Sequence, residues 1–177
     1  SYNYDKQNNN LTKEQAKEML KDMIKILHEK FWFKSSGLIG DTGQIIILGG
    51  KEQDGSYFCN ELTYLFIEVI EELQLPDPKV LLRVTDKVPR DLMELSLKCI
   101  KTGIGCPLFS NDDIIIPKLI EFGYDEKDSY NYVTSACWEP LIAGKSIDQN
   151  NITSIVYMKP FNEMLEKEEI EKLETYE

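Results

Sequence analysis

Residues 129–146 read Ser-Tyr-Asn-Tyr-Val-Thr-Ser-Ala-Cys-Trp-Glu-Pro-Leu-Ile-Ala-Gly-Lys-Ser. Pro140 disfavours helical backbone in the residue before it, so the segment around it is predicted to be extended. Side chains alternate between two faces in an extended segment. Cys137 and Glu139 are therefore expected on one face and Trp138 on the other, which would place a thiol and a carboxylate in one pocket.

A thiol and a carboxylate in one pocket can carry out chemistry without a histidine. A thiol S–H bond is weak enough to lose a hydrogen atom, and the resulting sulfur radical can take one from a substrate C–H bond. The neighbouring carboxylate can move the accompanying proton. A cysteine hydrolase would instead need a cation or histidine beside Cys137, and none lies close in the sequence. On local sequence alone, a buried cysteine beside a surface glutamate stays open as the alternative.

Strand and helix patterns alternate on the amino-terminal side of this stretch. Short β-branched apolar runs at 44–48 and 79–84 predict strands, and Gly49-Gly50 predicts a tight turn after the first. Capping residues and apolar spacings of three and four predict five helices: from Thr12 to about residue 33, from Asn60 to a stop at Pro76, from Pro89 to Gly103, from Asp112 to about Phe122, and from Asp125 to Tyr132. Cys99 lies on an apolar helix stripe and is expected in the core. The alternation predicts an α/β fold in one domain or part of one.

Composition and charge limit the classes of partner. The chain has 177 residues and a formal net charge of −11, so it is expected to repel phosphate backbones and anionic lipid surfaces. The four cysteines form no Cys-x-x-Cys pair and His28 is the single histidine, so no zinc or iron–sulfur site is expected. No apolar run is long enough to span a bilayer and no leader follows Ser1, which predicts a cytoplasmic protein.

The string Ser135-Ala-Cys-Trp-Glu-Pro140 resembles the cysteine-loop motif of the glycyl radical enzymes, the pyruvate formate-lyase-like family. Other strings that are similar to this family precede the loop in the family's order: Leu48-Gly-Gly50, Asp54-Gly55, Asn60-Glu-Leu-Thr63, Pro76-Asp-Pro78, Leu82-Arg-Val84, Gly105-Cys-Pro107, Asn111-Asp112, Phe122-Gly123 and Tyr132. The resemblance extends from about Thr12 to Asn162.

The resemblance implies a fold and a chemistry. It implies that residues 1–177 are part of a ten-stranded α/β barrel, with Cys137 as the thiyl radical residue and Glu139 as its acid/base partner. It also implies no bound metal, anaerobic metabolism and a homodimeric full-length enzyme. A separate radical S-adenosylmethionine activase would install the radical on a glycine in the remainder of the enzyme.

Two departures from the family refine this expectation. Pyruvate formate-lyases proper carry two adjacent cysteines in the loop, whereas Ala136 precedes Cys137 here. The chain therefore looks more like the lyase and dehydratase branches, and formate C-acetyltransferase-like acyl transfer is the alternative. The glycine motif, an Arg-Val-x-Gly-Tyr-like loop, is absent after Cys137, and Leu82-Arg-Val84 lacks the glycine. The chain by itself is expected to be inactive.

Further candidate site residues flank the motif. Arg83 could bind a substrate carboxylate or lie buried in an ion pair. Asn111, with Asp112, could face the pocket or cap a helix. Asp148 and Asn151 could line the substrate site or cap a helix at residue 153.

Both ends of the chain, at Ser1 and Glu177, look internal to a longer sequence. A non-catalytic interaction module is the competing interpretation. It predicts exposed apolar surface and self-association.

Overall fold

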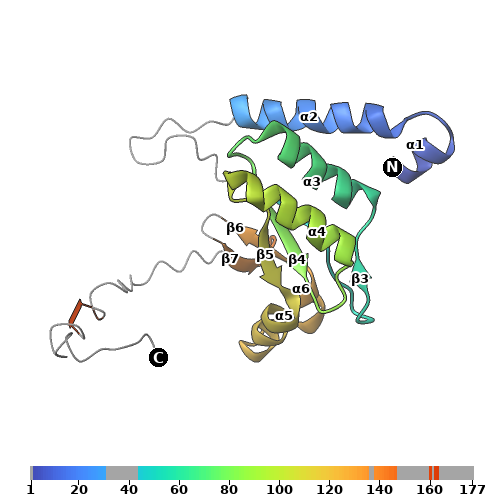
Figure 1. Ribbon diagram of the computed structural model, residues 1–177. Coiled ribbons are helices and arrows are strands. Elements are labelled where there is room, and N and C mark those ends of the chain that lie inside the picture. Colours follow the sequence, from blue (N-terminus) through green and yellow to red (C-terminus); the bar gives the residue numbers. More distant parts are fainter. Residues whose placement is uncertain (1, 31–43, 136–137, 147–159, 161, 164–177) are drawn as a thin grey trace.

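The computed structural model describes residues 2–30, 44–135, 138–146, 160 and 162–163 (Figure 1). The helices are α1 (Tyr2–Gln7), α2 (Lys13–Lys30), α3 (Glu61–Leu73), α4 (Arg90–Cys99), the π-helical turn η1 (Ile100–Ile104), α5 (Asp112–Glu121) and α6 (Glu126–Tyr130). The strands are β1 (Ile45–Leu48), β2 (Gly50–Lys51), β3 (Tyr57–Phe58), β4 (Lys79–Val84), β5 (Leu108–Asn111), β6 (Tyr132–Ser135) and β7 (Glu139–Ile142). None of the described helices is long and apolar enough to cross a membrane.

A parallel sheet organises these elements. Its strand order is β1-β4-β5, with Ile45 opposite Lys79 and Leu81 opposite Leu108. Helix α3 lies in the connection from β1 to β4, and α4 lies in the connection from β4 to β5. Parallel strands joined by helical crossovers define the α/β class, so the predicted fold class is confirmed.

One face of the sheet is covered by helices. Val80 and Leu82 of β4 are fully buried in one core cluster with Ile70 of α3 and Leu92 of α4, and α2 packs against α3. Figure 1 shows these three helices stacked above the strands. Complete burial of a Leu, Ile or Val side chain contributes about 1.5–3 kcal/mol, so this cluster is the main source of stability.

Cys99 lies in this core, as predicted. It is fully buried, and burial raises the pKa of its thiol to about 11. A thiol with this pKa stays protonated at neutral pH, which fits a packing residue and not a nucleophile.

The opposite face of the sheet carries the antiparallel β6–β7 hairpin. Side chains alternate along a strand, so Leu81 and Arg83 point away from the helices that cover Val80 and Leu82. Ser110 pairs with Arg83 in the register of β4 and β5 and hydrogen-bonds Tyr132 of β6. Tyr132 also packs with residues of α5. The hairpin is therefore held between α5 and the face of the sheet that carries Arg83 and Ser110.

Local capping signals explain where the helices begin. Thr12 and Gln15 form a capping box before α2, and Asn60 and Thr63 form one before α3. The Asp125 side chain accepts a hydrogen bond from the Asp128 N–H and caps α6. These predicted starts are confirmed, because each capping side chain satisfies an N–H group that the helix leaves free.

Two predicted helix ends need comment. The helix expected to end near residue 33 is described to Lys30, and residues 31–43 lie outside the described residues. The helix expected to lead to Tyr132 ends at Tyr130 instead. The reason is tertiary, because Tyr132 pairs with Ile142 across the hairpin and must be extended.

Replacing Gly49 by alanine is expected to lower the free energy of unfolding by about 2–3 kcal/mol. Gly49 has φ +65°, a conformation that costs a residue with a Cβ about 1–2 kcal/mol. The added Cβ would also overlap the Tyr57 hydroxyl and lie 3.1 Å from the Arg83 carbonyl oxygen.

Urea unfolding of Gly49→Ala and Gly123→Ala measures this difference. Gly123 has φ +96°, but no heavy atom lies within 4 Å of the position that a Cβ would take, so alanine there adds backbone strain alone. Equal losses in the two variants would contradict the expected overlap at Gly49.

Candidate active site

The hairpin carries the predicted catalytic motif. Tyr132 pairs with Ile142 and Ser135 pairs with Glu139, so the Ser135–Glu139 pair is at the closed end of the hairpin. Trp138, directly before β7, has φ +77°, in the left-handed region. The prediction of extended backbone is therefore wrong at Trp138, where the backbone has the positive φ that is common in short hairpin connections.

Of the two predicted catalytic residues, the structure describes Glu139. Glu139 is the first residue of β7 and its side chain is half-buried. Cys137 lies outside the described residues, so its pocket with Glu139 stays a prediction. Asp148 and Asn151 also lie outside the described residues.

Tyr132 anchors the base of the hairpin. Its ring is buried, and its hydroxyl donates to Asp112 Oδ1 over 2.7 Å. The phenol has one proton, so the 2.7 Å contact with Ser110 is a hydrogen bond that the Ser110 hydroxyl donates to Tyr132. Burial raises the pKa of the Tyr132 hydroxyl above its ordinary value. Tyr132 therefore stays a donor at every physiological pH.

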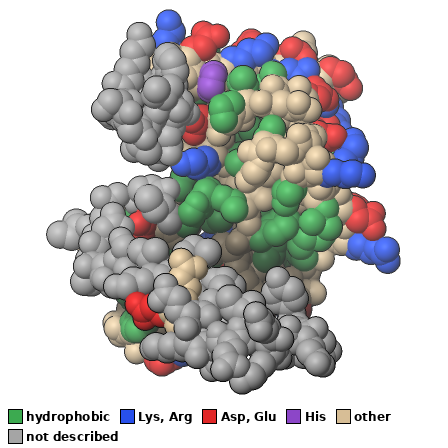
Figure 2. Space-filling model, turned by 60° about the vertical axis from the view of Figure 1, so that its left-hand side comes forward, with side chains coloured by type: hydrophobic (Ala, Val, Ile, Leu, Met, Phe, Trp, Pro, Cys, Tyr) green, Lys and Arg blue, Asp and Glu red, His purple; other side chains and the backbone are tan. Residues whose placement is uncertain are grey.

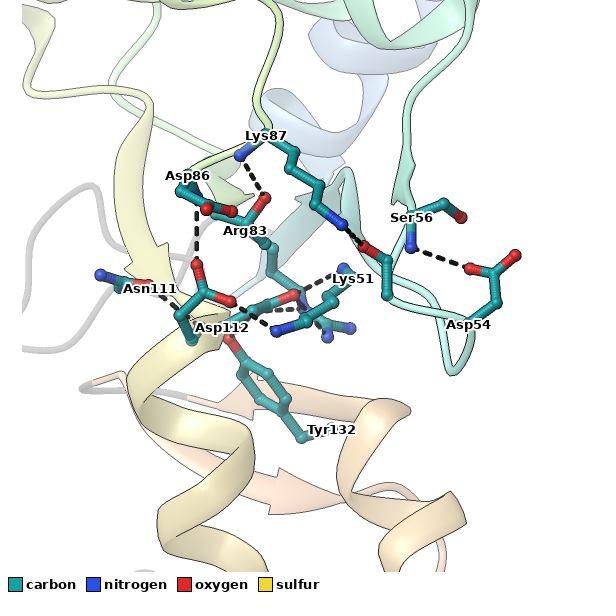
Figure 3. A network of polar contacts seen from close by, with 12 residues as sticks. Lys51, Asp54, Ser56, Arg83, Asp86, Lys87, Asn111, Asp112 and Tyr132 are labelled. Atoms are coloured by element: carbon teal, nitrogen blue, oxygen red, sulfur yellow. Dashed lines mark hydrogen bonds and ion pairs between the residues drawn. The ribbon is translucent and has the colours of Figure 1, made fainter.

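Asp112 is the centre of the polar network next to the hairpin, and Figure 3 shows Tyr132 pointing from the hairpin toward it. Its side chain is fully buried. Arg83 Nε donates to Oδ1 over 2.9 Å, Arg83 Nη2 lies 2.8 Å from Oδ2, and the backbone N–H of Lys51 donates to Oδ2 over 2.7 Å. With the Tyr132 hydroxyl as a further donor, this buried carboxylate has its charge and its lone pairs compensated.

Arg83 is found in the buried ion pair that was one of its two predicted roles. Its side chain is 8% exposed, and the Nε and Nη2 edge that binds a carboxylate through two hydrogen bonds is occupied by Asp112. Nη2 also donates to the Tyr130 carbonyl oxygen, and the guanidinium lies 4.2 Å from the centre of the Tyr132 ring. Gly50 leaves room for it, since a Cβ there would lie 3.1 Å from Arg83 Cζ.

Asn111 has the capping role that was one of its two predicted roles. Its side chain accepts a hydrogen bond from the Asp113 N–H at the start of α5. Asp113 in turn accepts hydrogen bonds from Lys51 Nζ and the Asp86 N–H, and the Lys51 contact holds the pKa of Asp113 below its usual range. A contact of Asn111 with substrate stays a prediction.

A cleft of about 430 Å³ opens beside this network. Gly49, Gly50, Lys51, Arg83 and Tyr130 are among the residues that line it. It lies at the carboxyl ends of β1 and β4, where open parallel sheets bind ligands.

Comparison with known proteins decides the family. A family model described as "Pyruvate formate lyase-like" matches residues 1–168. The chain belongs to the pyruvate formate lyase-like family. The predicted resemblance is thus confirmed over nearly the whole chain.

Relatives within the pyruvate formate lyase-like family include dehydratases. The chain is 30% identical over 146 residues to the probable dehydratase YbiW of Escherichia coli, covering 78% of this chain and 18% of that protein. It is 28% identical over 147 residues to the (2S)-3-sulfopropanediol dehydratase of Klebsiella oxytoca, covering 80% and 18%. The chain thus spans about 18% of the length of the curated relatives it matches.

A solved structure confirms the predicted barrel architecture. The crystal structure of a glycyl radical enzyme from Archaeoglobus fulgidus matches with a TM-score of 0.70 and 25% identity, over 81% of this chain and 19% of that one. The sheet, its helices and the hairpin therefore form part of an α/β barrel of the glycyl radical enzyme type.

Sequence reasoning missed the central residue of this pyruvate formate lyase-like site. Asp112 was predicted, with Asn111, either to face the pocket or to cap a helix, and Tyr132 was predicted only as part of a family pattern. Arg83, the second-last residue of β4, and Asp112, directly after β5, are opposite charges near the carboxyl ends of neighbouring strands. The positions of these two charges could have indicated the ion pair, because the carboxyl ends of parallel strands meet at one edge of a sheet.

Proposed function

We propose that this chain is the cysteine-loop segment of a glycyl radical dehydratase that removes water from a small 1,2-diol. The observation that carries the proposal is the sequence motif Cys137-x-Glu139, whose Glu139 begins β7 at the closed end of a hairpin that packs on a parallel sheet. The similarity to two dehydratases, one named for a propanediol, supports the reaction class. Ala136 in place of a second cysteine favours dehydration over acyl transfer.

In the proposed reaction Cys137 transfers the hydrogen atom and Glu139 transfers the proton. A glycyl radical, which would be on a glycine outside this chain, accepts the hydrogen atom of the Cys137 thiol. The Cys137 sulfur then takes a hydrogen atom from the carbon that bears one hydroxyl of the diol, and Glu139 accepts the proton of that hydroxyl. The neighbouring hydroxyl leaves and takes the proton back from Glu139 as water. The product radical recovers its hydrogen atom from Cys137, which leaves an aldehyde or ketone and a thiyl sulfur.

The proposal also gives a role to each of the other predicted site residues. Asp148 and Asn151 follow the hairpin and would bind the diol hydroxyls. Asn111 would contact substrate only from the start of α5, since its side-chain oxygen already caps the helix. Arg83 would support the site through the ion pair with Asp112 and would not bind a substrate carboxylate through two hydrogen bonds, because Asp112 occupies that edge of the guanidinium.

We further propose that residues 1–177 form part of a barrel that other segments complete. Leu108 and Phe109 on strand β5 are 38% and 39% exposed, and Figure 2 shows hydrophobic side chains gathered on one face below a rim of charged ones. Surface of this kind is usual where another part of a protein packs. A glycine loop, a radical S-adenosylmethionine activase, a homodimer and a cytoplasmic location complete the proposed enzyme. The chain alone is expected to be inactive.

The proposal is tested on the polypeptide as its source cell makes it, activated anaerobically. Electron paramagnetic resonance should show a glycyl doublet, and 1,2-propanediol or a related diol should lose water to form a carbonyl product. A doublet with no elimination from any small 1,2-diol would overturn the assigned reaction, and the absence of a doublet would overturn the radical mechanism.

Glu139→Gln is expected to lower turnover about 10²–10⁴-fold, because general acid–base catalysis contributes about this much. The glutamine keeps the size of the side chain but cannot accept the proton. Carbonyl product is measured after the doublet has been quantified, so that radical loss is not mistaken for lost catalysis. Glu126→Gln in the first turn of α6 is the matched control and should keep full turnover. Full turnover in Glu139→Gln would remove Glu139 from the mechanism.

A further inference from the structure

We infer that Tyr132 is the positioning residue that fixes the cysteine hairpin against the sheet, and that Asp112 and Arg83 hold it in place. This inference rests on the proposed function only for its effect on turnover. The anchoring itself is a property of the described contacts.

The first argument is the location of Tyr132 in the hairpin. Tyr132 and Ile142 are the pair at the open end, and Ser135 and Glu139 are the pair next to the loop. A two-stranded hairpin is marginally stable by itself and needs packing to keep one position. A contact that fixes the Tyr132 end therefore sets where the Glu139 end lies.

The second argument is the number of elements that meet at Tyr132. Its hydroxyl links β6 to Ser110 of β5 and to Asp112 of α5. Arg83 of β4 stacks on its ring and binds the Tyr130 carbonyl oxygen just before the hairpin. The backbone N–H of Lys51 in β2, three residues after the end of β1, donates to the same Asp112 carboxylate. The carboxyl ends of all three parallel strands are thereby tied to the base of the hairpin.

The third argument is the burial of the hydroxyl contacts. Tyr132, Ser110 and Asp112 are all buried, so water cannot replace a lost hydrogen bond among them. Burial raises the pKa of the Tyr132 hydroxyl above its ordinary value, so this hydroxyl stays protonated and keeps donating at neutral pH. Loss of one of these hydrogen bonds would therefore leave a buried polar group without a partner.

Transfer of a hydrogen atom and a proton depends on the positions of the reacting groups, so an anchor of the hairpin affects the rate. A displacement of about 1 Å at a reacting group can cost about 10²-fold in rate. Cys137 follows closely after the end of β6 and Glu139 begins β7, so movement of the hairpin would displace both residues. Tyr132 does not touch the reacting atoms in this scheme and acts through the hairpin.

The test compares Tyr132→Phe with Tyr57→Phe in the unactivated polypeptide as the cell makes it. Each variant removes one tyrosine hydroxyl that donates a hydrogen bond, because Tyr57 donates to the Arg83 carbonyl oxygen over 2.7 Å. Of the two tyrosines, Tyr132 alone belongs to the hairpin. Backbone amide hydrogen exchange in β6 and β7 should become about tenfold faster in Tyr132→Phe, as expected for one lost hydrogen bond. In Tyr57→Phe, exchange in β6 and β7 should stay within about twofold of wild type.

Ser110→Ala is the second variant, and it tests the same anchor if Tyr132→Phe does not fold. It keeps the Tyr132 ring and its bond to Asp112 but removes the Ser110 donor. A smaller rise in hairpin exchange, about threefold, is expected. If neither variant speeds exchange in β6 and β7 more than Tyr57→Phe does, the positioning role is wrong.

The activated enzyme provides the second readout. Tyr132→Phe should lower kcat about tenfold while KM changes less than about twofold and the glycyl doublet keeps its intensity. An unchanged kcat would overturn the effect on catalysis. Absence of a doublet in the wild type would count against the proposed function alone, because the exchange experiment needs no radical.

Discussion

Cys137→Ser is expected to abolish dehydration while leaving the glycyl radical intact. An alcohol O–H bond is much stronger than a thiol S–H bond, so serine cannot pass its hydrogen atom to the glycyl radical. Turnover should fall at least about 10⁴-fold, as when an essential catalytic group is removed from other enzymes. The measurement pairs the doublet intensity in electron paramagnetic resonance with the rate of carbonyl product formation, both after anaerobic activation.

Cys59→Ser is the matched control for this substitution. Cys59 is a half-buried free thiol outside the hairpin, and burial raises its pKa above the ordinary value. It should keep turnover within about twofold of wild type, as is usual for a residue away from the chemistry. Product formation by Cys137→Ser at more than a trace would show that another group abstracts the substrate hydrogen.

Asp112→Ala is expected to lower the free energy of unfolding by about 3–5 kcal/mol, the usual cost of breaking a buried ion pair from one side. The substitution leaves the 8% exposed Arg83 guanidinium without its counter-charge. It also leaves the Lys51 N–H and the Tyr132 hydroxyl without their acceptor. Thermal melting and soluble yield measure the loss.

Asp113→Ala is a stringent control, because Asp113 is the next residue of the same helical turn. Its side chain is 32% exposed and pairs with Lys51 Nζ, and exposed pairs contribute only about 0–1 kcal/mol. The control should therefore melt close to wild type. Similar melting temperatures for the two variants would mean that the network around Asp112 does not stabilise the fold.

The difference in stability between wild type and Asp113→Ala is expected to depend on pH, because only the wild type has the Asp113 carboxylate. Its pKa is lowered by Lys51, so its contribution to stability is present above the ordinary Asp pKa and is lost as the pH falls through the lowered value. This window lies below neutral pH. Neutral buffer is therefore suitable for comparing the two aspartate variants.

Local features of the fold could be predicted from the sequence with good accuracy. The capping side chains Thr12, Asn60 and Asp125 and the β-branched runs of β1 and β4 act on their own neighbours, so their effects are visible in a short window. The wrong prediction at Trp138 has a non-local cause, which is the pairing of β6 with β7. Extended backbone suits Pro140, but the pairing of Ser135 with Glu139 forces a reversal between them.

The α/β class, the helix starts, the family and the motif that contains Cys137 and Glu139 could all be predicted from the sequence, because each depends on neighbouring residues or on an ordered pattern. The ion pair between Arg83 and Asp112, 29 residues apart, and the contact of Tyr132 with Asp112 at the base of the hairpin depend on the tertiary structure. The pairing depends on the strand order β1-β4-β5, which brings the ends of separate strands together. Sequence separation contains no information on that order, so a strand-end arginine and a helix-start aspartate become partners only once the sheet has formed.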